Sequence, residues 1–122
     1  NSWLTGWVDW NLVLNEQGGP NHVKNWCIAP VIVRPGSNEV YYTPLYYVMK
    51  HFSRHIRPGA YRIGLDNPVN DLMATACLNP DGTISVNLLN QGDKQINYQL
   101  NIGESIASVT IDAQAVQTLI LN

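Results

Sequence analysis

Residues 6–15 read Gly-Trp-Val-Asp-Trp-Asn-Leu-Val-Leu-Asn, and residues 16–21 continue with Glu-Gln-Gly-Gly-Pro-Asn. An apolar and aromatic run of this length, closed by a Gly-Gly-Pro loop, predicts a strand that is buried on both faces and a shaped loop after it. Trp7 and Trp10, toward the carboxyl end of this strand, suit a pocket that stacks flat, weakly polar rings such as sugars. The chain begins shortly before the strand, so we expect it to be a piece of a longer enzyme.

The composition is that of a folded domain with unusually few charges. The chain has 122 residues, of which 45% are hydrophobic and 13% are charged, against about 25% charged residues in typical proteins. A net charge of −2 leaves no basic surface for phosphates, so we expect no nucleic-acid partner. No apolar run approaches the roughly 18 residues of a membrane-spanning helix, so we expect no transmembrane segment.

The cysteines and histidines predict neither a metal site nor a cofactor. Cys27 and Cys77 could form one disulfide, but Cys77 lies in an apolar strand-like run where a buried thiol is common, so we expect two unpaired thiols. His51 and His55 have the helical spacing of a metal pair, yet the sequence places no third ligand. We therefore expect both histidines to pack on the flank of a helix.

Residues 43–59 carry the signals of one amphipathic helix. Thr43 is a suitable N-cap, and Pro44 suits the first helical position because its missing N–H costs nothing there. Pro58 and Gly59 stop the helix. The side chains on its apolar stripe are Leu45, Val48, Met49, Phe52 and Ile56. The strand, loop and helix make a β–loop–α unit that needs neighbours to cover its strand, as in an α/β barrel.

After Pro58 the sequence changes to short alternating strands separated by turn residues. Residues 79–82, Asn-Pro-Asp-Gly, have the proline and glycine of a hairpin turn, and residues 90–93 make another turn. The expected strands are 61–65, 72–78, 84–88, 96–102, 106–111 and 116–121. This spacing is typical of an antiparallel β-sandwich, so we expect a mostly β fold over residues 58–122.

A set of motifs runs through nearly the whole chain in the order Trp7–Leu12, Glu16–Asn21, Pro44–Tyr47, His51–Ser53, Arg57–Gly59, Asn79–Gly82 and Val116–Ile120. Together they resemble the C-terminal part of glucosylceramidases, in family 30 of the glycoside hydrolases. Trp-x-Asp-Trp-Asn-Leu paired with Gly-Gly-Pro-Asn at this spacing is the specific part of the resemblance. The family joins a (β/α)8 barrel to a β-sandwich. The resemblance therefore implies that residues 1–57 are the final strand, loop and helix of the barrel and residues 58–122 the C-terminal β-sandwich.

The resemblance also implies a retaining β-glycosidase that hydrolyses β-glucosidic bonds in glucosylceramide or related glycans. Retention needs two carboxyl groups about 5 Å apart. In the family both are glutamates on earlier barrel strands, and Glu16, Glu39 and Glu104 of this chain occupy no such motif. We therefore expect the chain alone to be inactive and to need no cofactor. Its expected partners are a carbohydrate or glycolipid substrate and the remainder of the barrel.

The family's sugar-binding residues correspond to three positions of this chain. By resemblance, Trp10 lies in the glucose subsite, Asn25 corresponds to a side chain that hydrogen-bonds the sugar, and Trp26 corresponds to a loop residue at the pocket mouth. Cys27 follows on the same loop and is not a usual residue of the family there. Two alternatives stay open from the residues themselves: Trp10 could be barrel packing, and Asn25 could be a turn residue whose amide fixes the loop.

Two functions of other classes also stay open. A carbohydrate-binding β-sandwich would need exposed aromatic side chains on residues 58–122, which offer Tyr61 and Tyr98. A purely structural or self-associating piece is the second, because residues 1–57 would leave apolar barrel surface uncovered.

Overall fold

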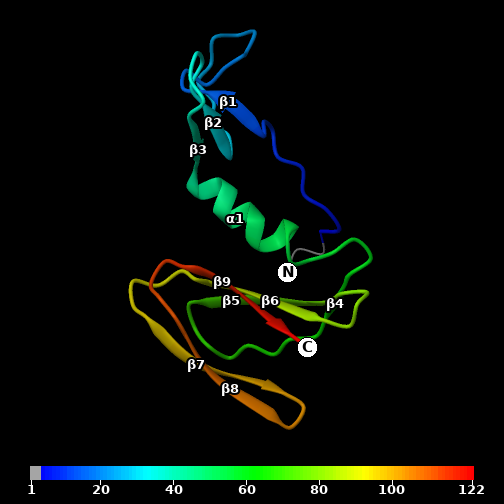
Figure 1. The fold of residues 1–122 in the computed structure, drawn as a ribbon. Helices are drawn as coiled ribbons and strands as arrows, with labels where there is room; N and C mark the ends of the chain where they lie inside the picture. The colour runs from blue at the N-terminus through cyan, green and yellow to red at the C-terminus, as the bar shows by residue number, and fades with distance from the viewer. Residues whose placement is uncertain (1–3) are drawn as a thin grey trace. The chain divides into compact units, whose positions relative to one another are not determined.

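The computed structural model describes residues 4–122 and divides the chain into two compact units, one before and one after Lys50 (Figure 1). The first residues of the expected barrel segment, residues 1–3, lie outside this described part. In chain order the elements are β1 (Val13–Asn15), β2 (Val31–Val33), β3 (Val40–Tyr42), α1 (Pro44–Ser53), β4 (Tyr61–Ile63), β5 (Leu72–Leu78), β6 (Ile84–Asn90), β7 (Ile96–Ile102), β8 (Ser105–Ile111) and β9 (Val116–Leu121). Over residues 4–122, no helix is long and apolar enough to cross a membrane.

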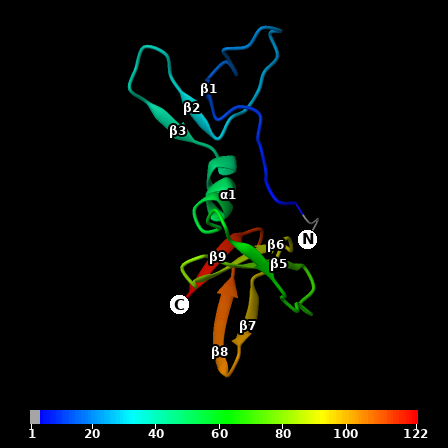
Figure 2. The same cartoon turned by 90° about the vertical axis from the view of Figure 1, so that its right-hand side faces the viewer.

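The first unit contains a three-stranded sheet with the order β1-β2-β3. β1 pairs with β2 in parallel, with Asn15 opposite Val33, and β2 pairs with β3 as an antiparallel hairpin. Because β1 and β2 run in the same direction, the loop after β1 and the hairpin loop after β2 leave the sheet at the same end (Figure 2). Residues 16–28 and 34–39 are therefore neighbours at the carboxyl end of the two parallel strands.

The strand expected over residues 6–15 is wrong in both length and burial. Only Val13–Asn15 is a strand, residues 4–10 are exposed, and Leu14 is the buried residue of β1. A strand is buried on both faces only where further strands flank it and other layers cover it. Within the described residues β1 has β2 as its single neighbour, so the chain supplies only part of the surroundings that the apolar run requires.

Helix α1 begins at Pro44 as predicted, but it ends at Ser53, before the expected stop at Pro58. One further turn continues beyond it, in which the Phe52 carbonyl accepts from the Ile56 N–H at 2.9 Å. The Thr43 hydroxyl does not cap the helix. It donates to the carbonyls of Ala29, at 3.0 Å, and Pro30, at 3.2 Å, and so fastens the start of α1 to the segment that enters β2.

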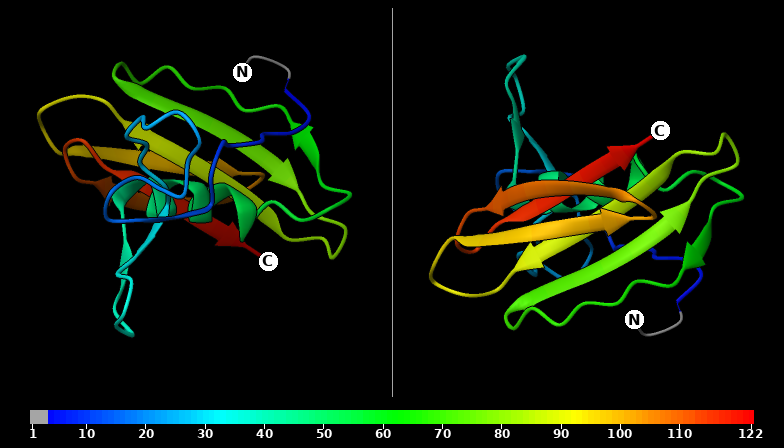
Figure 3. Two further views of the ribbon diagram at one scale, coloured as in Figure 1. Left: turned by 90° about the horizontal axis from the view of Figure 1, so that it is seen from above. Right: turned by 90° about the horizontal axis from the view of Figure 1, so that it is seen from below.

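The second unit is an antiparallel β-sandwich, as predicted. Its larger sheet has the order β4-β5-β6-β9, and β7 and β8 form a separate hairpin sheet. Figure 3 shows the β7–β8 hairpin lying across one face of the larger sheet. The strands at 72–78, 96–102 and 116–121 have the predicted bounds. β9 returns to pair with β6 rather than with its sequence neighbour β8.

Apolar side chains of the two sheets meet in one core. Its buried members are Leu72, Ala76, Val86, Leu88, Tyr98, Leu100 and Ile111. They alternate along their strands, as expected for a sheet face turned toward the core. The Tyr98 hydroxyl donates to Oε1 of Gln117 at 2.8 Å, which satisfies this polar group. Burial of the ring raises the pKa of Tyr98.

The turn at residues 79–82 also holds the segment that follows α1. The buried Asn79 accepts from the Arg57 N–H at 2.9 Å and donates to the His55 carbonyl at 3.0 Å. Its backbone closes the hairpin, because the Asn79 N–H donates to the Thr83 carbonyl at 2.8 Å. One side chain therefore joins the β5–β6 hairpin to residues 55–57.

A chain of hydrogen bonds crosses the outer face of β6, opposite the apolar core. Asn87 donates to Ser85 at 3.2 Å and accepts from the Thr118 hydroxyl at 2.7 Å, and both Ser85 and Asn87 are buried. The single hydroxyl proton of Thr118 is thus used, so Nδ1 of His51, at 2.8 Å from Thr118 Oγ1, must be the donor of that contact. His51 packs against the sheet through this bond.

Candidate functional site

The candidate site is the loop of residues 16–28 at the carboxyl end of β1. In folds with parallel strands, binding loops gather at this end of the sheet, because the connections there are free to vary. The loop starts at Asn15, the last residue of β1, and leads to the buried Ala29 before β2. It contains two of the three residues predicted to bind sugar, Asn25 and Trp26.

Asn15 builds the first turn of the loop with both its backbone and its side chain. Its Oδ1 accepts from the N–H groups of Gln17, at 3.0 Å, and Gly19, at 2.9 Å. Its N–H donates to the Gly19 carbonyl at 2.7 Å, and its carbonyl accepts from the Gly18 N–H at 3.0 Å. Residues 15–19 are therefore a closed turn, as the Gly-Gly-Pro sequence predicted.

Gly18 lets the far side of the loop approach this turn. Its φ is +70°, and a Cβ placed on it would lie 2.6 Å from the Cys27 nitrogen and 3.1 Å from the Trp26 Cα. Gly18 and Gly19 are both buried. The backbone of residues 26–27 thus crosses directly over Gly18, at a distance that no other residue allows.

Asn21 joins the turn to the segment that carries Asn25. Its Nδ2 donates to the Gly18 carbonyl at 3.0 Å and to the Asn25 carbonyl at 2.9 Å. An amide NH2 group has two hydrogens, so both bonds can form at once. Asn25 and Trp26, two of the three predicted pocket residues, therefore rest on a hydrogen-bonded support made by Asn15, Gly18 and Asn21.

All three predicted sugar-binding residues are exposed. Trp26 is 74% exposed and Trp10 is 83% exposed. Asn25 is exposed too, and its Nδ2 donates to Sγ of Cys27 at 3.3 Å. Asn25 and Trp26 lie together on the loop, whereas across residues 4–122 no hydrogen bond or ring contact joins Trp10 to either of them. The backbone N–H of Trp10 donates instead to Oδ1 of Asp9 at 2.8 Å.

Arg34 ties the loop to the β2–β3 hairpin and was not predicted from the sequence. Its guanidinium pairs with Glu16, at 2.8 Å, and with Glu39, and its Cζ lies 5.5 Å from the centre of the Tyr41 ring. The hydrogen bond and attraction to Glu16 raise the pKa of Arg34. In the sheet Glu16 and Arg34 directly follow the paired residues Asn15 and Val33, a register that the sequence alone does not give.

The two cysteines, unpaired as expected, differ in their surroundings. Cys27 is partly exposed on the loop, whereas Cys77 is buried in β5. Burial raises the pKa of the Cys77 thiol more than the nearby Arg62 lowers it. The thiolate is the reactive form of cysteine. Cys77 is therefore protected in two ways, because burial limits the access of reagents and because the raised pKa lowers its thiolate fraction.

We predict that a thiol reagent modifies the folded chain once, at Cys27, and modifies Cys77 only on unfolding. The measurement is the mass of the labelled chain and of its peptides, with and without denaturant. Because the folded-state pKa of Cys77 is raised, its contribution to stability is present below about pH 8.5, the ordinary thiol pKa, and is lost as the pH rises further. Labelling of Cys77 at the rate of Cys27 in the folded chain would contradict this prediction.

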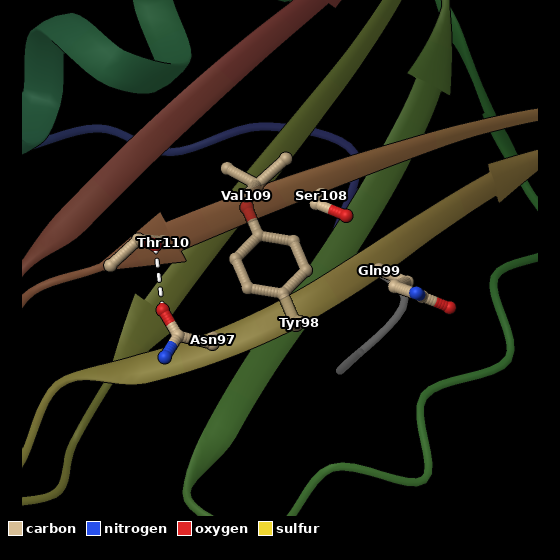
Figure 4. Close-up of a pocket in the computed structure, with 6 residues that line it drawn as sticks. All are labelled: Asn97, Tyr98, Gln99, Ser108, Val109 and Thr110. Atoms are coloured by element: carbon tan, nitrogen blue, oxygen red, sulfur yellow. Dashed lines mark hydrogen bonds between the residues drawn. The ribbon is translucent and has the colours of Figure 1, made fainter.

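A depression of about 400 Å³ on the β7–β8 hairpin is a second surface feature (Figure 4). It is open to solvent and is lined by Asn97, Tyr98, Gln99, Ser108, Val109 and Thr110. The one aromatic residue in this lining, Tyr98, is buried and bonded to Gln117. Asn97 and Thr110 bond to each other at 2.7 Å. The depression therefore offers no free ring on which a sugar could stack, and we place the candidate site on the first unit.

Comparisons with known proteins agree with both units. The glycosyl hydrolase family 30 TIM-barrel domain matches residues 1–56, and the glycosyl hydrolase family 30 beta sandwich domain matches residues 59–119. The chain belongs to glycosyl hydrolase family 30. The β-sandwich and the glucosylceramidase-like sequence, predicted from the motifs, are thereby confirmed.

Individual relatives support the same assignment. The chain is 40% identical to the lysosomal acid glucosylceramidase of Mus musculus over 94 residues. This matched stretch covers 76% of this chain and 18% of the mouse protein. A Caenorhabditis elegans relative that carries a glucosylceramidase name is 40% identical over 88% of this chain and 21% of its own length. The chain thus spans about a fifth of the length of these curated relatives.

Two solved structures have the same fold. SrfJ from Salmonella typhimurium superposes with a TM-score of 0.88 and 30% identity, over 93% of this chain and 25% of that one. The endo-beta1,6-glucanase BT3312 superposes with a TM-score of 0.81 and 26% identity, over 89% of this chain and 25% of that one.

Proposed function

We propose that this chain is the C-terminal part of a retaining β-glycosidase that hydrolyses β-glucosidic bonds, in glucosylceramide or a related glycan. In this proposal residues 1–57 are the final strand, loop and helix of its barrel, and residues 58–122 are a supporting β-sandwich. Trp10, Asn25 and Trp26 line the sugar subsite. The observation that carries the proposal is the pair of exposed indoles, one of them on a loop held by Asn15, Gly18 and Asn21 at the carboxyl end of parallel strands.

Exposed indole rings and an amide suit a sugar, which presents apolar C–H faces together with hydroxyl groups around its edge. Rings of tryptophan contribute large contact areas and an N–H donor. The Nδ2 of Asn25 bonds to Cys27 Sγ, a weak acceptor, so this donor can turn to a sugar hydroxyl at small cost. The names of the relatives, a glucosylceramidase and a β-glucanase, support a β-linked glucoside as the substrate.

The reacting carboxylates of the proposed enzyme lie outside this chain. Retention requires one carboxylate as nucleophile and a second carboxyl group as acid and base, about 5 Å apart. Glu16 and Glu39 are close to one another, but both are paired with the single guanidinium of Arg34. They therefore act as parts of the loop support rather than as a catalytic pair, and the chain contributes binding.

The remainder of the barrel is the proposed partner of the first unit. The large apolar side chains exposed before β2 are Leu4, Trp7, Val8, Trp10, Leu12, Val13, Val23, Trp26 and Ile28. So many exposed apolar side chains on one short segment differ from an ordinary protein surface, where exposed apolar residues are scattered singly. We propose that other barrel strands and helices cover most of them and leave Trp10 and Trp26 at the pocket. Self-association of the isolated chain through the same surface would follow from this exposure.

The test compares the full-length protein that contains this chain with the chain alone, on an aryl β-glucoside. The full-length protein is expected to release β-glucose first, which proton NMR distinguishes from α-glucose, and the chain alone is expected to match a heat-killed control. Turnover by the chain alone would mean that reacting carboxylates lie within it. Release of α-glucose first, or failure of the full-length protein to cleave β-glucosides, would overturn the proposed reaction.

A further inference from the structure

The Asn21 side chain joins the turn of residues 15–19 to the segment that carries Asn25 and Trp26. Asn21 Nδ2 bonds at 3.0 Å to the carbonyl of Gly18, the residue over which the backbone of Trp26 and Cys27 passes. The same nitrogen bonds at 2.9 Å to the carbonyl of Asn25. Asn21 therefore fastens the turn and the segment above it from the same atom.

We propose that Asn21 is a positioning residue for the sugar subsite, acting through the carbonyls of Gly18 and Asn25 on the side chains of Asn25 and Trp26. This inference rests on the proposed function, and it adds to it a residue that need not touch the sugar. Asn21 is itself exposed, so its removal leaves no cavity in a core. Its effect is on the loop geometry rather than on packing.

The position of Asn21 requires a side chain that donates hydrogen bonds. Two backbone carbonyls converge on Nδ2, and both require a donor. Aspartate has nearly the same shape but presents acceptor oxygens only, so it would face both carbonyls with negative charge. Alanine removes the donors without adding charge. Asn21→Asp is therefore expected to displace the segment of residues 25–27 more than Asn21→Ala does.

The readout in the full-length protein is the affinity for a glucose-shaped iminosugar inhibitor, together with kcat and KM on an aryl β-glucoside. For Asn21→Asp we expect an inhibitor weaker by about tenfold or more and a raised KM, because Asn25 and Trp26 would no longer be held in advance in the positions that meet the sugar. kcat is expected to change less, because contacts to the sugar ring are made in both ground and transition states. The urea midpoint of unfolding is expected to follow that of the control.

The matched control is Asn38→Asp, which adds the same charge to the exposed hairpin loop of the same unit. In the structure of residues 4–122 Asn38 makes no hydrogen bond, so its substitution should leave inhibitor affinity unchanged. Equal inhibitor affinity of Asn21→Asp and Asn38→Asp would overturn the proposal. If Asn21→Asp does not fold, Asn21→Ala is measured in the same way, with a smaller loss expected and the same overturning result.

A second readout on the chain of residues 1–122 separates this inference from the proposed function. Cys27 follows Trp26, so its rate of labelling by a thiol reagent reports on the geometry of the loop. Asn21→Asp and Gly18→Ala are both expected to speed labelling at least threefold over Asn38→Asp. Two results together would support the role of Asn21 in the loop but overturn the proposed glycosidase function. They are faster labelling of the Asn21→Asp chain and no binding of the iminosugar by the full-length protein. Faster labelling of Gly18→Ala together with unchanged labelling of Asn21→Asp would overturn the role of Asn21.

Discussion

Asn90→Ala is expected to lower the free energy of unfolding of the β-sandwich by about 3 kcal/mol, because the side chain is fully buried and satisfies three backbone groups. Its Nδ2 donates to the carbonyls of Lys94, at 2.7 Å, and Asp112, at 2.8 Å. Its Oδ1 accepts from the Gly92 N–H at 2.9 Å. Alanine would leave these three buried backbone groups without their side-chain partner. Urea denaturation followed by circular dichroism measures the change.

Asn101→Ala is the control for this experiment, since Asn101 is an exposed asparagine on β7 whose loss should change the free energy of unfolding by less than about 0.5 kcal/mol. Asn90→Asp gives a second check. Its carboxylate would face two carbonyl oxygens at neutral pH, and protonation at low pH would restore one donor. Burial against the two carbonyls would raise the pKa of this carboxyl above the ordinary aspartate value of about 4, so the penalty of Asn90→Asp relative to Asn90→Ala should shrink as the pH falls toward about 4 and change little below it. Equal free energies for Asn90→Ala and Asn101→Ala would contradict the assigned role.

The β-sandwich could be predicted from the sequence because its strands are local and half-buried. Leu72, Ala76, Val86 and Leu88 fall on alternate positions of their strands. This period of two is the same whichever neighbour the strand pairs with. The pairing itself could not be read off the pattern. β9 has the same alternation as β8, and only the three-dimensional core decides that it joins β6.

The buried asparagines mark the limit of that pattern. Asn79 and Asn90 were interpreted as turn residues, which is correct, but turn signals are ordinarily satisfied by solvent. In the structure their amides hold segments distant in sequence, residues 55–57 for Asn79 and Asp112 for Asn90. Nothing in a single sequence separates an asparagine that serves its own turn from one that serves a second segment.

The first unit shows why a prediction can be right about family and wrong about local structure. The run at residues 6–15 indicates a strand inside a closed barrel, and the family match over residues 1–56 agrees with that setting. The strand itself forms only at Val13–Asn15, where β2 provides hydrogen bonds. The long-range contacts that would order residues 6–12 are not made by the elements described. The roles of Asn21 and Arg34 were missed for a related reason, since both join segments that meet only after the loop has folded.

Trp10→Ala in the full-length protein is expected to lower kcat/KM on a β-glucoside by about 30- to 150-fold. This corresponds to losing about 2–3 kcal/mol, the contribution of one large side chain that is covered on binding. In the chain of residues 1–122 the same substitution should leave the free energy of unfolding within about 0.5 kcal/mol, because the indole is 83% exposed and so buries little area. The two measurements together separate a binding role from a packing role.

Trp7→Ala is the matched control, since Trp7 is a second exposed indole, 69% accessible, on the same segment. On a strand that extended over residues 6–15 the odd spacing would turn Trp7 and Trp10 to opposite faces, so only one could reach the sugar. Trp7→Ala should therefore change kcat/KM by less than about threefold unless it unfolds the barrel, which the denaturation midpoint of the full-length protein reports. If Trp7→Ala instead lost as much activity as Trp10→Ala at an unchanged midpoint, both rings would reach the sugar. The segment would then not be a regular strand in the full-length protein, and Trp10 would no longer be the specific ring of the subsite.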